Sequence, residues 1–126
     1  MKMLIRRSLL LWLVCFVCAT AAAGQASQAE SPAERRAKEF AKLLDSGNRV
    51  ELRKYATENF APSFLSIPME QHLGFLSSVH DSTRGVEFHS VQDAKPNEAT
   101  VLLKTKLTGQ WMALLVRVEP EAPHRI

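Results

Sequence analysis

The stretch Ala99–Val118, ATVLLKTKLTGQWMALLVRV, decides the fold that the sequence predicts. It holds two runs of alternating residues joined by Thr108-Gly109-Gln110, and a period of two places alternate side chains on opposite faces of a strand. Gly109 suits a hairpin turn because glycine adopts positive φ without steric cost. The stretch therefore predicts two antiparallel strands with one apolar face for the upstream residues to cover. The expected apolar face consists of Ala99, Val101, Leu103, Thr105, Leu107, Met112, Leu114, Val116 and Val118.

The beginning of the chain has the three parts of a secretory signal peptide. Lys2, Arg6 and Arg7 precede the apolar run Leu9–Ala19, and small residues follow. We expect residues 1–23 to be the signal peptide, with cleavage after Ala23 or Ala26. The protein is then exported, to the periplasm or the outside of a bacterium. An uncleaved membrane anchor is the alternative, although the run is shorter than the roughly 20 residues of a spanning helix.

Three basic residues and both cysteines of the chain lie within the expected signal peptide. Formal net charge is +3, from 16 basic and 13 acidic residues, but three of the basic residues precede Ala23. The remaining charge is balanced, so we expect no nucleic-acid partner and no stable membrane insertion after cleavage. Cys15 and Cys18 form a Cys-x-x-Cys pair inside the apolar run. We therefore expect no disulfide, no metal and no cofactor in the exported protein.

Helical signals fill the chain upstream of the two strands. Residues 24–30 are small and polar, which predicts a flexible lead-in. The sequence Ser31-Pro32-Ala33-Glu34 predicts a helix start with a capping box, and Gly47 predicts its end. A second helix is expected from Asn48 to about Ala56, and a third from Pro68 to a turn at 81–85. The buried residues expected on the first and third helices are Ala33, Ala37, Phe40, Ala41, Leu44, Met69, Leu73, Leu76 and Val79.

Two further segments complete the predicted fold. Phe60, Phe64 and Leu65 are expected to enter the core from a loop. Val86–Val91 predicts a strand, with Val86 and Phe88 on one face and Glu87, His89 and Val91 on the other. The fold class is α+β, with three amino-terminal helices packed on a curved antiparallel sheet of at least three strands. Residues 31–126 form this single domain.

The sequence offers few candidates for catalysis or binding. It contains no Ser-x-x-Lys, Gly-x-Ser-x-Gly, His-Glu-x-x-His or phosphate-binding glycine loop. We expect no catalytic residue in this chain alone. The alternative is an acid–base pair drawn from His72, His89, Asp81 and Glu87. Packing in the core or on the hairpin is the favoured interpretation of Tyr55 and Trp111, and lining a pocket is the alternative. His80 is interpreted as a helix cap.

Three segments resemble a known module. They are Phe40…Leu43-Leu44-Asp45-Ser46-Gly47, then Tyr55-Ala56-Thr57-Glu58-Asn59-Phe60, and finally Val118-Glu119-Pro120-Glu121-Ala122-Pro123-His124-Arg125-Ile126. The pattern is similar to the amino-terminal module that precedes the catalytic domain in exported bacterial serine hydrolases of the beta-lactamase-like and tail-specific-peptidase-like kinds. The resemblance implies a cystatin-like cone fold, of the nuclear transport factor two and SnoaL-like group.

The same resemblance bears on function. Those hydrolases continue after the Pro-His-Arg-Ile segment into another strand and a catalytic domain, whereas this chain ends at Ile126. We therefore expect a domain without its last strand, whose open edge forms a homodimer or pairs with a partner strand. The expected function is an exported, non-catalytic accessory or binding module. A small cone-fold isomerase or hydrolase, and an interaction protein that pairs through its sheet edge, are the alternatives.

Overall fold

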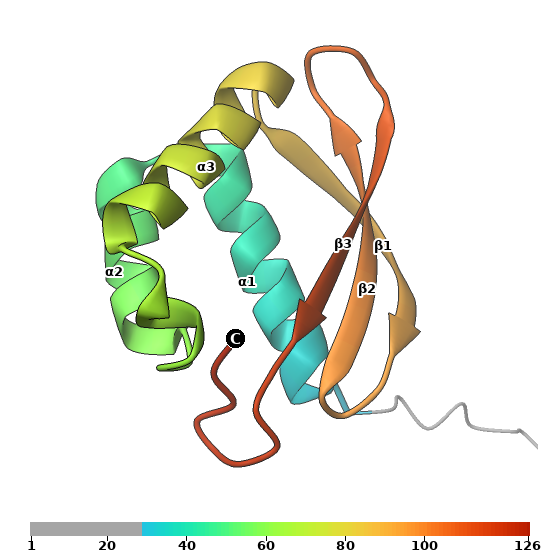
Figure 1. Ribbon diagram of the computed structural model, residues 1–126. Helices are drawn as coiled ribbons and strands as arrows, with labels where there is room; N and C mark the ends of the chain where they lie inside the picture. The colour runs from blue at the N-terminus through green and yellow to red at the C-terminus, as the bar shows by residue number, and fades with distance from the viewer. Residues whose placement is uncertain (1–28) are drawn as a thin grey trace, which may run out of the picture.

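The computed structural model describes residues 29–126, which fold into three α-helices, one short 3-10 turn and three strands. Figure 1 shows the helices on one side of the sheet. The α+β prediction is confirmed, while the predicted signal peptide and most of the lead-in lie outside the described residues. The elements in order are α1 (Pro32–Ser46), α2 (Arg49–Asn59), η1 (Phe64–Ser66), α3 (Met69–Thr83), β1 (Val86–Ala94), β2 (Glu98–Thr105) and β3 (Trp111–Arg117).

Local capping explains where α1 begins and ends. The Ser31 hydroxyl accepts a hydrogen bond from the Glu34 amide at 3.1 Å. Gly47 adopts the left-handed conformation, with φ of 61°, and its amide donates to the Leu43 carbonyl at 3.1 Å. These groups satisfy backbone donors and acceptors that a helix end leaves without partners. Both predicted boundaries of the first helix are therefore confirmed.

The other two helices run further than predicted. The Asn48 side chain caps α2 by accepting from the Val50 and Glu51 amides, and the helix continues three residues past Ala56. The turn expected at 81–85 is wrong in its first residues, because α3 extends through Thr83. Arg84, in the left-handed conformation, is the residue that ends it.

The sheet is an antiparallel meander in the order β1-β2-β3. The alternation predicted for β2 is confirmed, since Ala99, Val101, Leu103 and Thr105 are all buried. The prediction for Leu107 is wrong: it lies in the connection between β2 and β3, and 58% of it is exposed. Once the ladder ends, the turn rather than the strand period sets the direction of a side chain.

The alternation predicted for β1 is correct from Val86 to His89 and wrong at Val91. Register shifts between Phe88 and Ser90, and between Val91 and Asp93, interrupt its pairing with β2. Each such bulge adds a residue that has no partner and reverses the faces that follow. Val91 consequently packs against the core, whereas the prediction placed it on the face of Glu87. Phe88 precedes both shifts and lies on the predicted face, opposite Leu103, although 40% of it is exposed.

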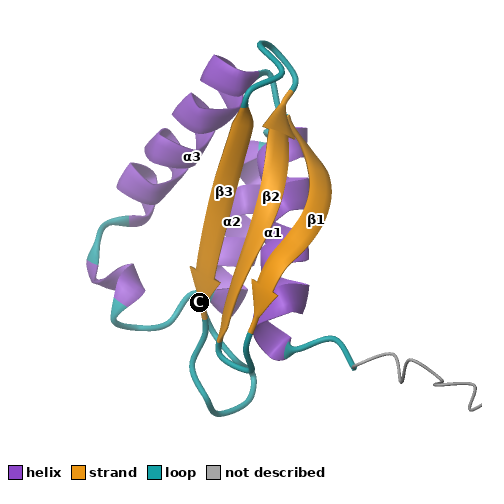
Figure 2. Ribbon diagram, turned by 90° about the vertical axis from the view of Figure 1, so that its right-hand side faces the viewer, coloured by secondary structure: helices purple, strands orange, loops and turns teal. Residues whose placement is uncertain are grey.

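One helix provides most of the cover for the sheet. Helix α1 packs across all three strands. Helix α3 packs against α1 and α2, on the side of the sheet that α1 covers. Figure 2 shows that α3 lies beyond β3, past the edge of the sheet. The core between α1 and the sheet includes Ala37, Leu44, Val101 and Leu103. Phe60 is buried as predicted, but Phe64 is 42% exposed.

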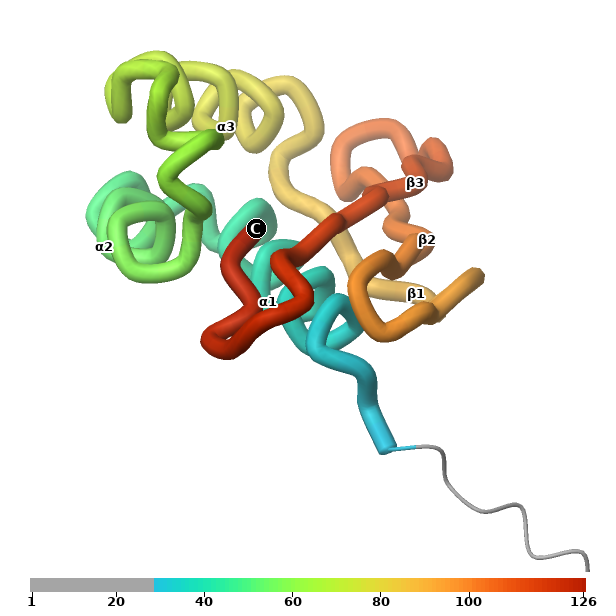
Figure 3. Tube along the Cα trace, turned by 60° about the horizontal axis from the view of Figure 1, so that its bottom comes forward, coloured from blue at the N-terminus to red at the C-terminus, as the bar shows by residue number. Residues whose placement is uncertain are grey.

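The carboxyl-terminal segment returns to the helices. Figure 3 shows it crossing over α1 between α2 and the sheet. The Ile126 amide donates to the Asn59 carbonyl at 2.8 Å, and the Ala61 amide donates to the Ile126 carbonyl at 2.7 Å. Ile126 therefore bridges the residues that follow α2. In the part of the chain that is described, no helix combines the length and apolarity needed to cross a membrane.

Candidate functional site

An apolar cavity of about 270 Å³ lies between α3 and β3. Its position follows from the fold, because α3 lies beyond β3, which is the last strand of the sheet formed by residues 29–126. Apolar cavities of this kind are common ligand or partner sites. Its walls are Phe40, Phe60, Phe64, His72, Phe75, Leu76, Leu114, Leu115, Val116 and Ile126.

A second cavity, of about 510 Å³, continues the first along β3. The two share Phe64, Leu115, Val116 and Ile126, so together they form one cleft. Exposed apolar side chains stand at its mouth: Phe75 is 69% exposed and Leu115 is 48% exposed. We call this continuous space the β3 cleft.

The edge of β3 lies beside the β3 cleft and carries backbone groups that have no backbone partner within residues 29–126. The Val118 amide donates to the Asn97 carbonyl, and the Thr105 amide donates to the Gln110 carbonyl. In the register of β2 and β3, these two bonds show that the even-numbered residues of β3 exchange hydrogen bonds with β2. The N–H and C=O groups of the odd-numbered residues therefore point away from β2. Among residues 29–126, none of these outward groups has a backbone partner. They belong to Trp111, Ala113, Leu115 and Arg117.

Among the described residues, His72 is the one ionisable side chain in the wall of the apolar cavity. It is 7% exposed, and its Nε2 atom lies 3.0 Å from the Phe64 carbonyl oxygen. The Phe64 ring packs against the imidazole with centroids 4.6 Å apart. His72 thus links the 3-10 turn η1 to α3, and this contact gives it a structural role.

The remaining histidines also contact backbone or aromatic groups. His80 Nδ1 lies 2.9 Å from the Leu44 carbonyl oxygen, and His124 Nδ1 lies 3.0 Å from that of Glu119. The His89 ring contacts Trp111. Asp81 is exposed near the end of α3 and lines none of the cavities described. The four predicted acid–base candidates therefore do not meet at one site, although Glu87 and His89 line one shallow pocket with Trp111.

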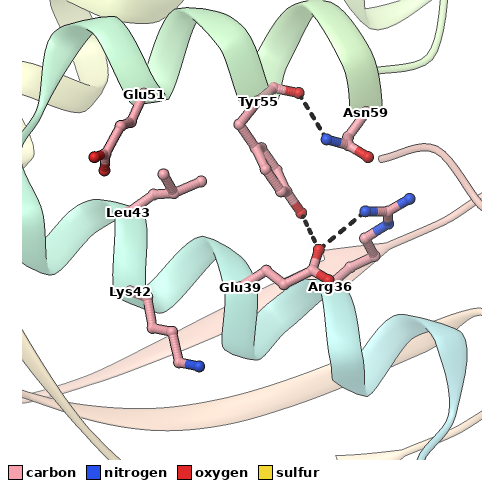
Figure 4. Close-up of a pocket in the computed structure, with 7 residues that line it drawn as sticks. All are labelled: Arg36, Glu39, Lys42, Leu43, Glu51, Tyr55 and Asn59. Carbon is pink, nitrogen blue, oxygen red and sulfur yellow. Dashed lines mark hydrogen bonds and ion pairs between the residues drawn. The ribbon is translucent and has the colours of Figure 1, made fainter.

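A polar groove of about 420 Å³ separates α1 from α2 (Figure 4). Tyr55 lies in it, and its hydroxyl donates to Glu39 Oε2 at 3.0 Å. Arg36 Nη1 donates to the same oxygen at 2.9 Å. The other guanidinium nitrogens of Arg36 donate to the carbonyls of His124 and Pro123 at 3.2 and 2.9 Å. The groove is thus occupied by a network that joins α1, α2 and the carboxyl-terminal segment.

Tyr55 makes the groove sensitive to high pH. Burial, together with the adjacent Glu39 carboxylate, raises the pKa of Tyr55 above its ordinary value. The unfolded chain, with a tyrosine pKa of about 10, loses this proton first. The contribution to stability is therefore intact below about pH 10 and declines as the pH rises further.

We expect the ultraviolet absorbance of tyrosinate to rise at a higher pH in the native protein than in denaturant. Tyr55 is the single tyrosine of the sequence, so the signal is unambiguous. In Tyr55→Phe, the part of the alkaline loss of stability due to this residue should disappear. Identical titration curves in native and denatured protein would contradict this expectation.

The comparisons with known proteins add no relative: no family model, no curated protein and no solved structure matches the chain. Within residues 29–126, no cluster of three or more histidine, cysteine or acidic side chains is arranged to hold a metal ion. The site must be interpreted from its geometry. Sequence reasoning identified the aromatic residues of the loop but not the cleft they border, because the cleft depends on where α3 passes β3.

Proposed function

We propose that this chain is an exported, non-catalytic binding module with a cystatin-like cone fold. In this proposal it corresponds to the module that precedes the catalytic domain of exported bacterial serine hydrolases. The layout of one long helix across a three-stranded antiparallel meander supports the cone fold. Export rests on the tripartite sequence before Ala23.

The observation that carries this function is the open edge of β3 beside the β3 cleft. Unpaired N–H and C=O groups on a sheet edge are a template for another extended chain. Alternate side chains of that chain would point beneath α3, into the apolar cavity lined by Phe75 and Leu76. Backbone hydrogen bonds and apolar burial would then act together. We infer that the module receives a fourth strand at this position.

The expected occupant is a single extended segment that runs antiparallel to β3. Figure 1 shows the chain end at Ile126 beside the carboxyl end of β3, so a segment following Ile126 could run along the free edge. A second folded copy fits less well. Helix α3 projects past β3, and two copies paired edge to edge would direct their α3 helices toward the same space.

The experiment compares the chain with a version extended after Ile126 by about eight residues, within the usual strand length. The extension alternates valine and threonine. We expect a higher melting temperature and less association by light scattering. Amide exchange should slow at Ala113 and Leu115, whose groups face the free edge, and stay unchanged at Leu114, which bonds to β2.

A matched extension with proline at alternate positions provides the control, since proline cannot donate to a ladder. Equal exchange at Ala113 and Leu115 in both extended chains would overturn the proposal. So would a stable monomer of the unextended chain at high concentration whose edge amides already exchange slowly. The valine–threonine segment added as a separate peptide tests whether a partner can supply the strand.

The geometry does not favour the alternative of a histidine–carboxylate enzyme. The imidazole in the cavity, that of His72, bonds to a backbone carbonyl. In the described part of the chain no histidine is paired with a carboxylate.

A further inference from the structure

The face of the sheet that points away from the helices carries an aromatic and charged cluster. Glu87 of β1 stands opposite Lys104 of β2, and Lys104 stands opposite Trp111 of β3. The three side chains therefore form a row across the three strands. With His89 they line a shallow pocket of about 330 Å³. We call Glu87, His89, Lys104 and Trp111 the outer-face cluster.

A β-bulge brings His89 into this cluster. The pairing of β1 with β2 passes from Phe88 to Ser90, so His89 is the extra residue without a partner. Bulges redirect side chains and are frequent next to functional sites. The imidazole and the Trp111 indole meet edge to face, with centroids 4.8 Å apart at 67°. Because they come from β1 and β3, the two rings together cover the middle strand.

The Trp111 side chain is exposed to solvent although two neighbouring side chains contact its ring. The residue is 55% exposed, His89 contacts it on one side, and Lys104 Nζ lies 5.5 Å from the ring centroid. Among the described residues, Glu87 and Lys104 form no ion pair within 4.0 Å, unlike the neighbouring Glu98 and Arg117. The cluster thus presents an exposed aromatic surface beside one carboxylate, one ammonium and one imidazole, whose polar atoms have no side-chain or backbone hydrogen-bond partner in the described part of the chain.

We propose that the outer-face cluster binds a neutral saccharide. A sugar ring has an apolar C–H face, which stacks on an exposed indole, and a hydroxyl edge, which needs both donors and acceptors. Glu87 supplies the acceptor, Lys104 donates, and His89 does either. A phosphate or nucleic-acid ligand fits less well, because the Glu87 carboxylate opposes it and a single lysine attracts it. A purely apolar ligand would bury these charges without partners.

The test is a titration of the full chain, followed by the indole N–H resonances. The probes are β-1,4-linked trimers of N-acetylglucosamine and of glucose at millimolar concentrations, with inorganic phosphate as a separate probe. The chain has two tryptophans, Trp12 and Trp111, and the variant Trp111→Ala identifies the second signal. We expect one of the trimers to shift the Trp111 resonance. Followed by the backbone amide resonances of Glu87 and Lys104, which remain in the variant, binding to Trp111→Ala should be at least about tenfold weaker, the equivalent of about 1.4 kcal/mol.

Two further variants keep the proposal testable if Trp111→Ala does not fold. Glu87→Gln and Lys104→Met leave the ring in place and should each weaken binding several-fold. Leu107→Ala, at an exposed residue of the adjoining connection, is the control and should bind as the native chain does. No shift with either trimer, or equal affinity in Trp111→Ala, would overturn the proposal. A shift with phosphate alone would overturn it too and indicate an anion site.

Discussion

Replacing Leu76 with alanine is expected to lower the free energy of unfolding by about 2–5 kcal/mol. Leu76 is 6% exposed and belongs both to the core and to the wall of the apolar cavity. Its removal loses the transfer free energy of a buried side chain and enlarges a space that α3 cannot close, because α3 also packs on α1 and α2. Urea denaturation followed by circular dichroism measures the loss.

Phe75→Ala provides the matched control for Leu76→Ala. Phe75 is the adjacent residue of the same helix, but 69% of it is exposed. Its replacement should change the free energy of unfolding by no more than about 0.5 kcal/mol, as is usual at the surface. A loss below that value for Leu76→Ala would place Leu76 outside the core. It would also contradict the register of α3.

Replacing Arg36 with alanine is the second large effect, with an expected loss of about 2–3 kcal/mol. Hydrogen bonds to charged groups contribute about 1.5–3 kcal/mol, and Arg36 makes three, to Glu39, Pro123 and His124. The Arg36 side chain is 11% exposed, so water cannot easily replace the hydrogen bonds that its removal breaks. We expect the carboxyl-terminal segment to detach first, since two of the three bonds hold it.

Amide exchange distinguishes this local effect from general destabilisation. In Arg36→Ala the amides of Glu119 and Ile126, which bond within and at the end of that segment, should exchange faster than those of β2. Arg35→Ala is the control, because Arg35 is the exposed neighbour on the same helix. Equal losses of stability in the two variants would show that the three bonds of Arg36 contribute nothing specific.

The parts of the fold that could be predicted from the sequence are those with local causes. Ser31 and Gly47 define α1 through contacts within four residues, and the alternation of β2 needs only the strand period. The face reversal in β1 could not be predicted. It arises at Phe88 and Val91 from pairing with a strand that lies further along the chain.

For the candidate sites, the sequence identified some of the residues but not how they come together. Trp111, Glu87 and His89 were each identified as candidates from residue type, but their meeting on one face needs the bulge at His89. Tyr55 was identified as a candidate for lining a pocket, whereas its partners Glu39 and Arg36 were not among the candidates. The β3 cleft needs the path of α3 past β3, a relation between elements that periodicity does not contain.

The two edges of the sheet differ, and this difference would limit the number of strands that any complex of this module could add. Edge β1 is interrupted twice and carries charged residues such as Glu87 and Asp93, which discourages pairing, whereas β3 is regular along its length. A molecule with two receptive edges would add neighbours on both sides and grow into a fibril. With one receptive edge, each molecule accepts one strand and growth stops. We therefore expect any complex formed at β3 to be finite, with one partner strand for each module.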